Sequence, residues 1–297
     1  MTLPSQLPMG STDSAKPSAS SKSVSVRILV FDSGVGGLSI CREIMAVCGP
    51  VEIHYLSDNK GFPYGEKPEK YLIDHASRLL LQATDIIKPS LIVIACNTAS
   101  TVVLPRLRQQ LAIPVIGVVP AIKTAARLSK THTIALLATP ATTERRYTEQ
   151  LIKQYADQKV VIRLGSSELV RHIEDHLHGD RLDRNLLKKI VETLKRQPGG
   201  QAIDTVVLGC THFPLIKSEF EKISPEWQWI DSGKAVASRV NDTLQQNSDA
   251  KLINARPQHT AWLTQWRNTD AVKTLFYQYG FNEVQWFSGD SALKLNE

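Results

Sequence analysis

Cysteine is scarce in this chain, with four residues among 297. No two of them form a CxxC pair, and the chain is much longer than the small secreted domains that disulfides hold together. The four cysteines therefore fit neither a disulfide scaffold nor a zinc site, and we expect no metal. Cys41 and Cys48, seven positions apart in an apolar helical pattern, are predicted to be small buried hydrophobic residues.

The sequence also lacks a long apolar run. No stretch approaches the roughly 20 residues of a transmembrane helix, and residues 1–25 have no apolar centre like that of a secretory signal. These residues are instead rich in serine and proline without periodicity, which predicts a flexible tail. We expect a cytoplasmic protein that does not engage a membrane.

Charge of one sign is not concentrated anywhere in the chain. The formal net charge is +6 and the pI is near 9.1, but lysines and arginines are scattered among acidic residues. A nucleic-acid-binding protein would gather them on one face or along one helix. We therefore predict a mildly basic, solvated surface and no requirement for nucleic acid.

From Arg27 onward, strand-like apolar runs alternate with helix-like stretches. Eight such runs begin near residues 27, 51, 91, 114, 133, 160, 205 and 227. Continuous apolar runs of this length are typical of strands buried on both faces of a parallel sheet. The alternation predicts an α/β fold with mainly parallel sheets, built from eight strand–helix units.

Two of the runs end alike. "LIVIACNTAS" (91–100) and "TVVLGCTHFP" (205–214) each reach a cysteine, Cys96 or Cys210, that is followed by polar residues. Any two buried strands look similar, so the apolar part alone proves little. The shared cysteine favours two similar α/β halves that face each other across a cleft, with a ligand at these strand ends.

A thiol acts as a base or nucleophile only as the thiolate, which needs backbone N–H groups, a helix N-terminus or a cation to stabilise it. Both cysteines precede a predicted helix. Hydrogen-bonding side chains adjoin them: Asn97, Thr98, Thr211 and His212. A single cysteine in this position is equally well explained as a structural residue, whereas a matched pair indicates chemistry.

A third strand ends in "FDSGVGGLS" (31–39), where Asp32 and Ser33 precede three glycines. The glycines allow a tight turn and a close approach of the backbone to an anion at a helix start. No GK[ST] follows, and Ser39 stands where a dinucleotide fingerprint has its third glycine. The loop therefore predicts a small anionic ligand, with Asp32 as the N-cap of the next helix as the alternative.

The loop "NKGFPYGEK" (59–67) follows the second strand. Its proline and glycine mark a turn, and Tyr64 offers a phenol to a ligand, although a plain connecting loop explains the same residues. Its position in the same half as Cys96 favours the binding role.

Two opposed thiols suit one class of reaction. A hydrolase needs only one nucleophile, and a thiol phosphatase needs an arginine close after its cysteine, whereas Arg106 comes ten positions after Cys96. Disulfide oxidoreductases normally have cysteines close in sequence. Stereoinversion at a carbon acid uses both thiols, because one thiolate removes a proton while the other thiol delivers one to the opposite face.

The motifs "VFDSGVGGLS", "FPYGEK", "ACNTAST" and "LGCTHFPL", in this order, resemble the glutamate racemases of the aspartate/glutamate racemase family. The resemblance runs from about Arg27 to Asp231, and "VIGVVPAIK" (115–123) and "LGSSELV" (164–170) resemble its proteobacterial branch. It implies two α/β domains around a buried glutamate, no cofactor, and D-glutamate made for peptidoglycan. The expected domains are residues 26–120 with 235–297, which carry Asp32 and Cys96, and residues 121–234, which carry Cys210 and His212.

The resemblance also implies roles for individual residues. Cys96 would act on D-glutamate and Cys210 on L-glutamate. The implied auxiliary groups are Asp32 on the Cys96 side, with His212 and Glu168 on the Cys210 side. Substrate contacts are implied for Asp32, Ser33, Tyr64, Gly65, Asn97, Thr98, Thr211 and His212, and also for Thr139 and Thr142, for which helix capping is the alternative.

The Cα proton of an amino acid with an ionised carboxylate is very weakly acidic, and no pyridoxal lysine motif is evident in the sequence. Catalysis must then rely on oriented charges and water exclusion in a cleft that closes on its substrate. The alternatives are another two-thiol racemase, such as an aspartate racemase, and a non-enzymatic two-lobed protein that closes on an acidic ligand. The resemblance further implies a UDP-linked muramyl-alanine precursor as activator, and whether copies of the chain form a homo-oligomer stays open.

Overall fold

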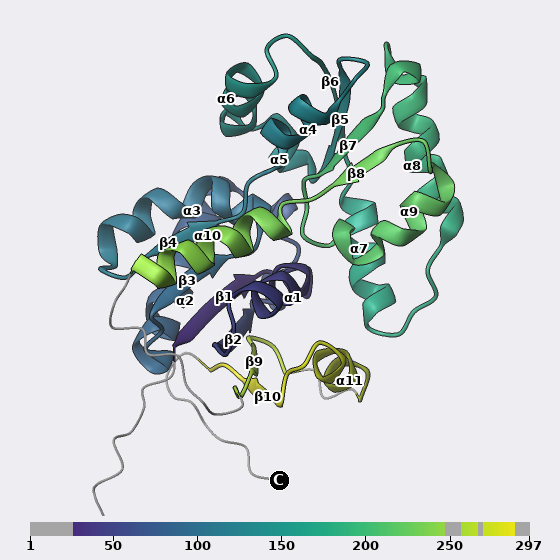
Figure 1. The fold of residues 1–297 in the computed structure, drawn as a ribbon. Helices are drawn as coiled ribbons and strands as arrows, with labels where there is room; N and C mark the ends of the chain where they lie inside the picture. Colours follow the sequence, from purple (N-terminus) through teal and green to yellow (C-terminus); the bar gives the residue numbers. More distant parts are fainter. Residues whose placement is uncertain (1–25, 247–256, 267–269, 289–297) are drawn as a thin grey trace, which may run out of the picture.

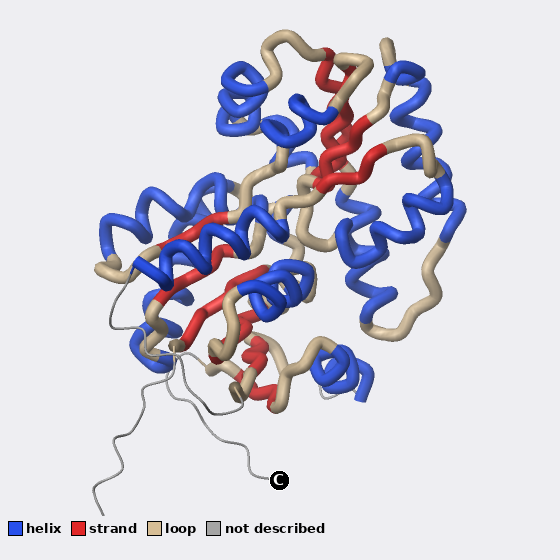
Figure 2. The backbone as a smooth tube through the Cα atoms, viewed as in Figure 1, coloured by secondary structure: helices blue, strands red, loops and turns tan. Residues whose placement is uncertain are grey.

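The computed structural model describes residues 26–246, 257–266 and 270–288, and the tail expected at residues 1–25 lies outside this part of the chain. The strands form two separate sheets (Figures 1 and 2). The first sheet holds, in spatial order, β10 (Glu283–Trp286), β9 (Thr260–Leu263), β2 (Glu52–Ser57), β1 (Arg27–Asp32), β3 (Leu91–Ile94) and β4 (Val115–Gly117). All neighbouring strands in it are parallel.

The second sheet repeats the arrangement of the first. It holds, in spatial order, β6 (Val160–Gly165), β5 (Thr133–Ala138), β7 (Thr205–Leu208) and β8 (Gln228–Ile230), again all parallel. This order matches β2-β1-β3-β4, and the bounds of β3 and β7 differ by 114 positions at both ends. The predicted α/β fold with two similar halves and parallel sheets is therefore confirmed.

All eight predicted strands are present, but the structure adds β9 and β10 to the first sheet. Both have only four residues, and β10 lies at the sheet edge with both of its end residues exposed. The sequence of β10, EVQW, alternates polar and apolar residues, and the apolar residues of β9 lie between threonines, so neither strand carries a continuous apolar run of the expected length. The prediction of eight strand–helix units was incomplete for this reason.

Helices cover both faces of each sheet (Figure 1). On the first sheet, one face packs against α1 (Leu38–Val47), α10 (Gly233–Gln246) and α11 (Asp270–Gln278), and the other against α2 (Glu69–Ile87) and α3 (Asn97–Gln110). On the second, α7 (Ser167–Leu177), α8 (Arg184–Arg196) and α9 (Lys217–Ile223) cover one face, and α4 (Ile122–Leu128) and α6 (Arg146–Tyr155) the other. Four short helices complete the described chain: α5 (Pro140–Glu144) and the 3-10 turns η1 (Tyr64–Glu66), η2 (Gly200–Ala202) and η3 (Phe213–Ile216). None of the described helices is long and apolar enough to cross a membrane.

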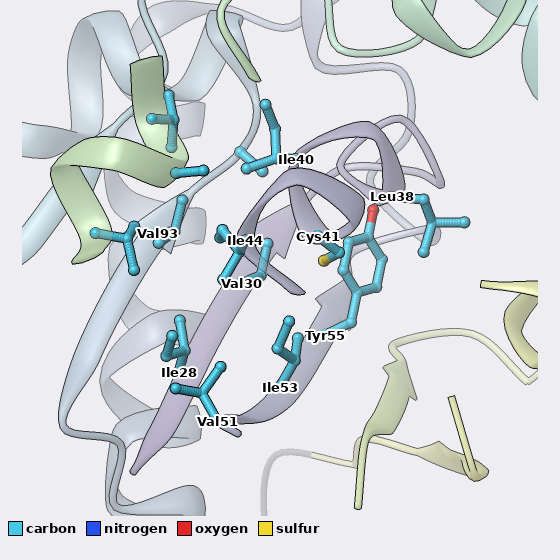
Figure 3. Close-up of a cluster of buried hydrophobic side chains, with 14 of the residues drawn as sticks. Ile28, Val30, Leu38, Ile40, Cys41, Ile44, Val51, Ile53, Tyr55 and Val93 are labelled. Carbon is cyan, nitrogen blue, oxygen red and sulfur yellow. The ribbon is translucent and has the colours of Figure 1, made fainter. Parts of the chain in front are cut away.

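Burial on both faces explains the continuous apolar runs. In β1, Ile28 and Val30 belong to the cluster under α1, whereas Leu29 belongs to the cluster under α2 and α3. Successive side chains of a strand point to opposite faces, so each residue of the run has a hydrophobic layer to enter. Figure 3 shows the α1 side, where Cys41 packs beside Tyr55 as the small buried residue that was predicted.

Phe276 anchors the unit formed by β9, α11 and β10. Its fully buried ring lies 5.6 Å from that of Tyr55 and 5.4 Å from that of Phe281, measured between centroids. We expect Phe276→Ala to lower the free energy of unfolding by about 3–5 kcal/mol, because it removes a large ring and leaves a cavity. Equilibrium urea unfolding measures this. Tyr277→Ala, at a position that is 51% exposed, is the control and should change stability by less than about 0.5 kcal/mol; equal losses in the two variants would contradict this packing.

Candidate active site

Strand ends from both sheets meet around one small cavity. Its volume is about 20 Å³, which has room for about one water molecule. It is lined by Asp32, Ser33, Pro63, Tyr64, Gly65, Cys96, Asn97, Thr98, Thr139, Val170, Cys210, Thr211 and His212. The carboxyl ends of β1, β3, β5 and β7 supply most of this lining, as expected for a parallel α/β sheet.

The cavity brings together every predicted site residue except Thr142 and Glu168. Thr142 is buried and bonds to the lining residue Thr139, so it stands directly behind the cavity wall. Glu168 is exposed in the first turn of α7. Among the residues that the structure describes, no three His, Cys, Asp or Glu side chains are placed to hold a metal ion.

Cys96 is the N-cap residue of α3 and is only 6% exposed. The hydroxyl of Ser33 lies 4.0 Å from its sulfur. Burial raises the pKa of Cys96 and the negative charge of Asp32 raises it further, while the N–H of Ala99 in the first helical turn opposes both. Cys96 is therefore a thiol in the closed protein, and a strong base whenever it loses its proton.

Asp32 forms hydrogen bonds with residues of both halves and does not cap a helix. Its Oδ1 accepts the N–H of Ser33 at 2.6 Å, and its Oδ2 accepts the hydroxyl of Thr211 at 2.8 Å. Burial raises the pKa of Asp32, although the charge of His212 and the hydrogen bond from Thr211 act against this. The alternative of Asp32 as an N-cap is wrong, because Gly37 occupies that position of α1.

Cys210 stands beside a buried ion pair. Its sulfur is 3.7 Å from Nδ1 of His212, and Nε2 of His212 is 2.6 Å from Oε2 of Glu174. Burial alone would lower the pKa of His212, but hydrogen bonds with Cys210 and Glu174 raise it well above its usual 6.5. Burial alone would raise the pKa of Glu174, but its bond with His212 brings it below 4.5. Cys210 thus faces a positive charge, whereas Cys96 faces a negative one.

The carboxylate in this pair comes from Glu174 rather than from the predicted Glu168. Both residues lie on α7, but six positions separate them, which places their side chains on different faces of the helix. Glu174 shares the buried face with Leu169, Val170 and Ile173. An acidic residue within an apolar stripe of helical spacing is the sequence signal that would have identified it.

The glycine-rich loop binds an anion that the protein itself supplies. The N–H of Val35 donates to Oε2 of Glu174 at 3.0 Å, from one half of the molecule to the other. A Cβ at Gly34 would come within 2.5 Å of that oxygen, and one at Gly36 within 2.4 Å of Nδ1 of His212. The two glycines therefore let the loop close over the ion pair. One N–H of the expected anion-binding loop thus binds a carboxylate of the other half, and the binding of a small anionic ligand stays a prediction.

Tyr64 uses its phenol within the protein. Its hydroxyl donates to Oδ2 of Asp58 at 2.6 Å, and Asp58 also accepts the hydroxyl of Thr264 at 2.8 Å and contacts Nε2 of His75 at 2.7 Å. Tyr64 is 1% exposed. Tyr64 and Gly65 both line the cavity, so the phenol is held by Asp58 at the cavity wall, and its contact with a ligand stays a prediction.

Three threonine hydroxyls meet on the wall near Cys96. Oγ1 of Thr98 is 3.1 Å from that of Thr139 and 3.5 Å from that of Thr142. Thr139 is also the N-cap of α5, where it accepts the N–H of Thr142, so capping and a place in the cavity wall coexist. Asn97 is 4% exposed, and among the described residues its Nδ2 has no hydrogen-bond partner. These donors suit a carboxylate ligand.

Further contacts hold the two halves together around the cavity. The hydroxyl of Ser39 donates to the carbonyl of Thr211 at 2.9 Å. Near the cavity-lining Val170, Arg171 forms an ion pair with Glu66 of the opposite half. Together with the contact of Val35, these bonds close the cleft over the two thiols.

The ion pair of Glu174 and His212 predicts a pH-dependent stability. The lowered pKa of Glu174 contributes stability above pH 4.5 that is lost as the pH falls through its folded value, and the raised pKa of His212 contributes stability below pH 6.5 that is lost as the pH rises through its own. We expect Glu174→Gln to destabilise the protein by about 3 kcal/mol, since it leaves a buried charge unpaired, with the largest difference between pH 4.5 and 6.5.

Urea unfolding of both proteins across this pH range measures the difference. Glu168→Gln is the matched control, because it makes the same change at an exposed position of the same helix. A difference that does not vary with pH, or an equal loss in the control, would contradict the pairing.

Comparisons with known proteins agree with this geometry. Residues 28–240 match the family model described as Asp/Glu/Hydantoin racemase. The glutamate racemase of Sodalis glossinidius is 40% identical over 284 residues, which cover 94% of this chain and 97% of that protein. The glutamate racemase of Vibrio cholerae is 44% identical over 264 residues, covering 88% and 96%.

A solved structure is similar over the same length. Escherichia coli glutamate racemase, determined with L-glutamate and the activator UDP-MurNAc-Ala, superposes with a TM-score of 0.79 at 38% identity. The match covers 89% of this chain and 98% of that one. Sequence, fold and the paired thiols agree, and the chain belongs to the Asp/Glu/Hydantoin racemase family, on its glutamate racemase branch.

Proposed function

We propose that the protein interconverts L- and D-glutamate by proton transfer at Cα between two cysteines. The observation that carries this proposal is that Cys96 and Cys210, at the ends of corresponding strands, line one closed cavity. Cys96 acts on D-glutamate and Cys210 on L-glutamate. In each turnover the Cα–H bond breaks and its proton joins one thiolate, while the other S–H gives its proton to the opposite face of Cα. The two sulfurs exchange protonation states in the process.

The two thiols have charged neighbours of opposite sign, and each neighbour acts on one thiol. The imidazolium of His212 places a positive charge beside the sulfur of Cys210, and Glu174 holds that imidazolium in place, in the role expected of Glu168. Asp32, whose charge raises the pKa of Cys96, makes that sulfur a stronger base when it is deprotonated. Each half-reaction is thereby served by a different auxiliary group.

The cavity wall supplies the groups that would hold the substrate. We assign the substrate carboxylates to the side-chain amide of Asn97 and the hydroxyls of Thr98, Thr139 and Thr211, because these are buried donors at the wall, and to the hydroxyl of Thr142, which lies directly behind it. The remaining contacts come from Asp32, Ser33 and His212 and from the backbone of Tyr64 and Gly65. The unpartnered Nδ2 of Asn97 supports this assignment, since a buried amide lacking an acceptor among the described residues is costly without a ligand.

No cofactor is needed in this scheme, because fixed donors and charges in a dry cleft replace an electron sink. Residues 26–120 with 235–297 and residues 121–234 act as the two domains that open and close around glutamate. The reaction takes place in the cytoplasm and provides D-glutamate for peptidoglycan. The family membership and the two similar sheets support this assignment.

Isotope incorporation tests the two-base reaction. Each glutamate enantiomer is incubated in deuterated water and the early product is examined by mass spectrometry and NMR. We expect solvent deuterium at Cα of the product and little in the recovered substrate, because the base that removes a proton is not the acid that delivers one. Rapid deuterium entry into the starting enantiomer would instead indicate a single exchanging base.

Removal of either thiol gives the corresponding mutational result. Cys96→Ala and Cys210→Ala should each lower racemisation in both directions by about 10³-fold or more, because each thiol is needed in both directions. Cys48→Ala, a buried thiol outside the cavity, should keep its activity. Parallel assays with the aspartate enantiomers address the aspartate racemase alternative, and faster turnover of aspartate than of glutamate would overturn the proposed substrate.

A UDP-linked muramyl-alanine precursor is proposed as an activator, in line with the activator bound to the Escherichia coli relative. A groove of about 690 Å³ beside α3, β4 and α10 carries two arginines, Arg108 and Arg239. Arg108 is held at its wall by donating to the carbonyl of Val115 at 3.1 and 3.2 Å. Two guanidinium groups in one groove suit a diphosphate.

Steady-state assays with and without UDP-MurNAc-Ala test the activator. We expect a higher rate with the precursor, and Arg239→Gln should abolish this increase without changing the basal rate. Lys234→Gln, another exposed cation of α10, is the matched control and should respond as the original protein does. Absence of activation in the original protein would rule out the activator, and full activation of Arg239→Gln would rule out this groove.

A further inference from the structure

Arg145 extends from one half of the molecule to the other near Cys96. It lies between α5 and α6 and is half-buried. Its Nη1 donates to the carbonyl of Thr98 at 2.8 Å and to the hydroxyl of Thr101. Both acceptors belong to the first turns of α3, the helix that Cys96 caps. A side chain from the Cys210 half therefore fastens the helix that carries the thiol of the other half.

The helical turn that Arg145 holds also forms the cavity wall. Thr98 lines the cavity and contacts Thr139 and Thr142 of the opposite half through its hydroxyl. In the same turn, the N–H of Ala99 is the backbone group that lowers the pKa of Cys96. Movement of this turn would therefore displace both a proposed substrate contact and the dipole directed at the thiolate.

The charge distribution gives Arg145 a second effect. Cys210 has the imidazolium of His212 within 3.7 Å, whereas Cys96 has Asp32 as its charged neighbour, which disfavours a thiolate. Burial lowers the pKa of Arg145, and attraction to Glu69 and to Cys96 partly restores it. The guanidinium thus contributes positive potential at the thiol that lacks an imidazolium.

We propose that Arg145 is a positioning residue for the half-reaction at Cys96. It acts through the carbonyl of Thr98, holding the first turn of α3 against the Cys210 half so that the helix N-terminus and a fixed positive charge support the Cys96 thiolate. The support exists only in the closed protein, because the bond of Arg145 spans the two halves. This inference rests on the proposed two-thiol reaction. In that reaction, taken as two consecutive proton transfers, the proton of D-glutamate first passes to Cys96 and Cys210 then protonates the opposite face.

Enantiomers have equal free energies, so kcat/KM must fall equally in both directions in any variant and cannot locate the affected step. Primary isotope effects can show which of the two proton transfers is affected. If Arg145→Met raises only the barrier at Cys96, the isotope effect on kcat/KM should increase for D-[2-²H]glutamate, whose deuteron Cys96 removes. It should decrease toward unity for L-[2-²H]glutamate, because removal of that deuteron by Cys210 becomes less rate-limiting.

The experiment compares Arg145→Met, Arg145→Lys and Arg146→Met with the original protein. We expect a loss of about 10- to 100-fold in kcat/KM for Arg145→Met, the range for a lost charge-assisted hydrogen bond. Arg145→Lys should recover part of the rate, because its ammonium can still donate to the carbonyl of Thr98. Arg146→Met changes the exposed neighbouring arginine and should behave as the original protein does.

The outcomes separate this inference from the proposed function. If the original protein does not racemise glutamate, the proposed function fails. If it does, but the two isotope effects of Arg145→Met stay as in the original protein or change in the same direction, the positioning role fails alone. A purely structural loosening would lower the rate without opposite shifts in the isotope effects, and Arg145→Lys supplies the same test should Arg145→Met fold poorly.

Discussion

The carboxylate of Glu174 is the group on which the closed structure depends. It is buried, and an ionised carboxylate can be buried only where charge and hydrogen bonds replace its water. His212 of its own half supplies the charge, and the N–H of Val35 supplies a hydrogen bond from the other half. The charge of the carboxylate and the closure of the cleft therefore depend on each other. If the halves separate, the carboxylate loses the hydrogen bond that the other half donates to it. Positions 34 and 36 need glycine because the close approach of the two halves leaves no room for a Cβ.

The two halves repeat the positions of the thiols but not their surroundings. Cys96 and Cys210 follow corresponding strands, yet the first caps a long α-helix and adjoins a carboxylate, whereas the second precedes a 3-10 turn and adjoins an imidazole. The repeated backbone thus places one thiol from each half at the same cavity. The side chains around the two sulfurs place opposite charges beside them. An enzyme for two mirror-image substrates does not need mirror-image environments, only barriers of similar height on both sides.

The sequence predicted most of the fold and nearly all of the cavity wall. The eight central strands were recognisable because burial on both faces demands continuous apolar runs, and the site residues because they follow those strands directly. The strands β9 and β10 were missed because threonines bound the apolar residues of β9 on both sides, and β10 alternates polar and apolar residues at the partly exposed sheet edge. Glu174 was missed because it comes from the middle of a helix rather than from a strand end. The periodicity of the sequence does not encode which side chains meet in the fold. The contact of Arg145 with α3 and the hydrogen bond from Tyr64 to Asp58 could not be predicted for this reason.

The small volume of the cavity has a consequence for the chemical lifetime of the protein. Thiolates are the form of cysteine that peroxides oxidise, first to sulfenic acid and then irreversibly further. Cys96 and Cys210 are each only 6% exposed, and the cavity that they line has room for about one water molecule. In the closed form that the structure shows, oxidants therefore have little access to either sulfur. The same closure that keeps water out of the cavity thereby also protects its two thiols from oxidation.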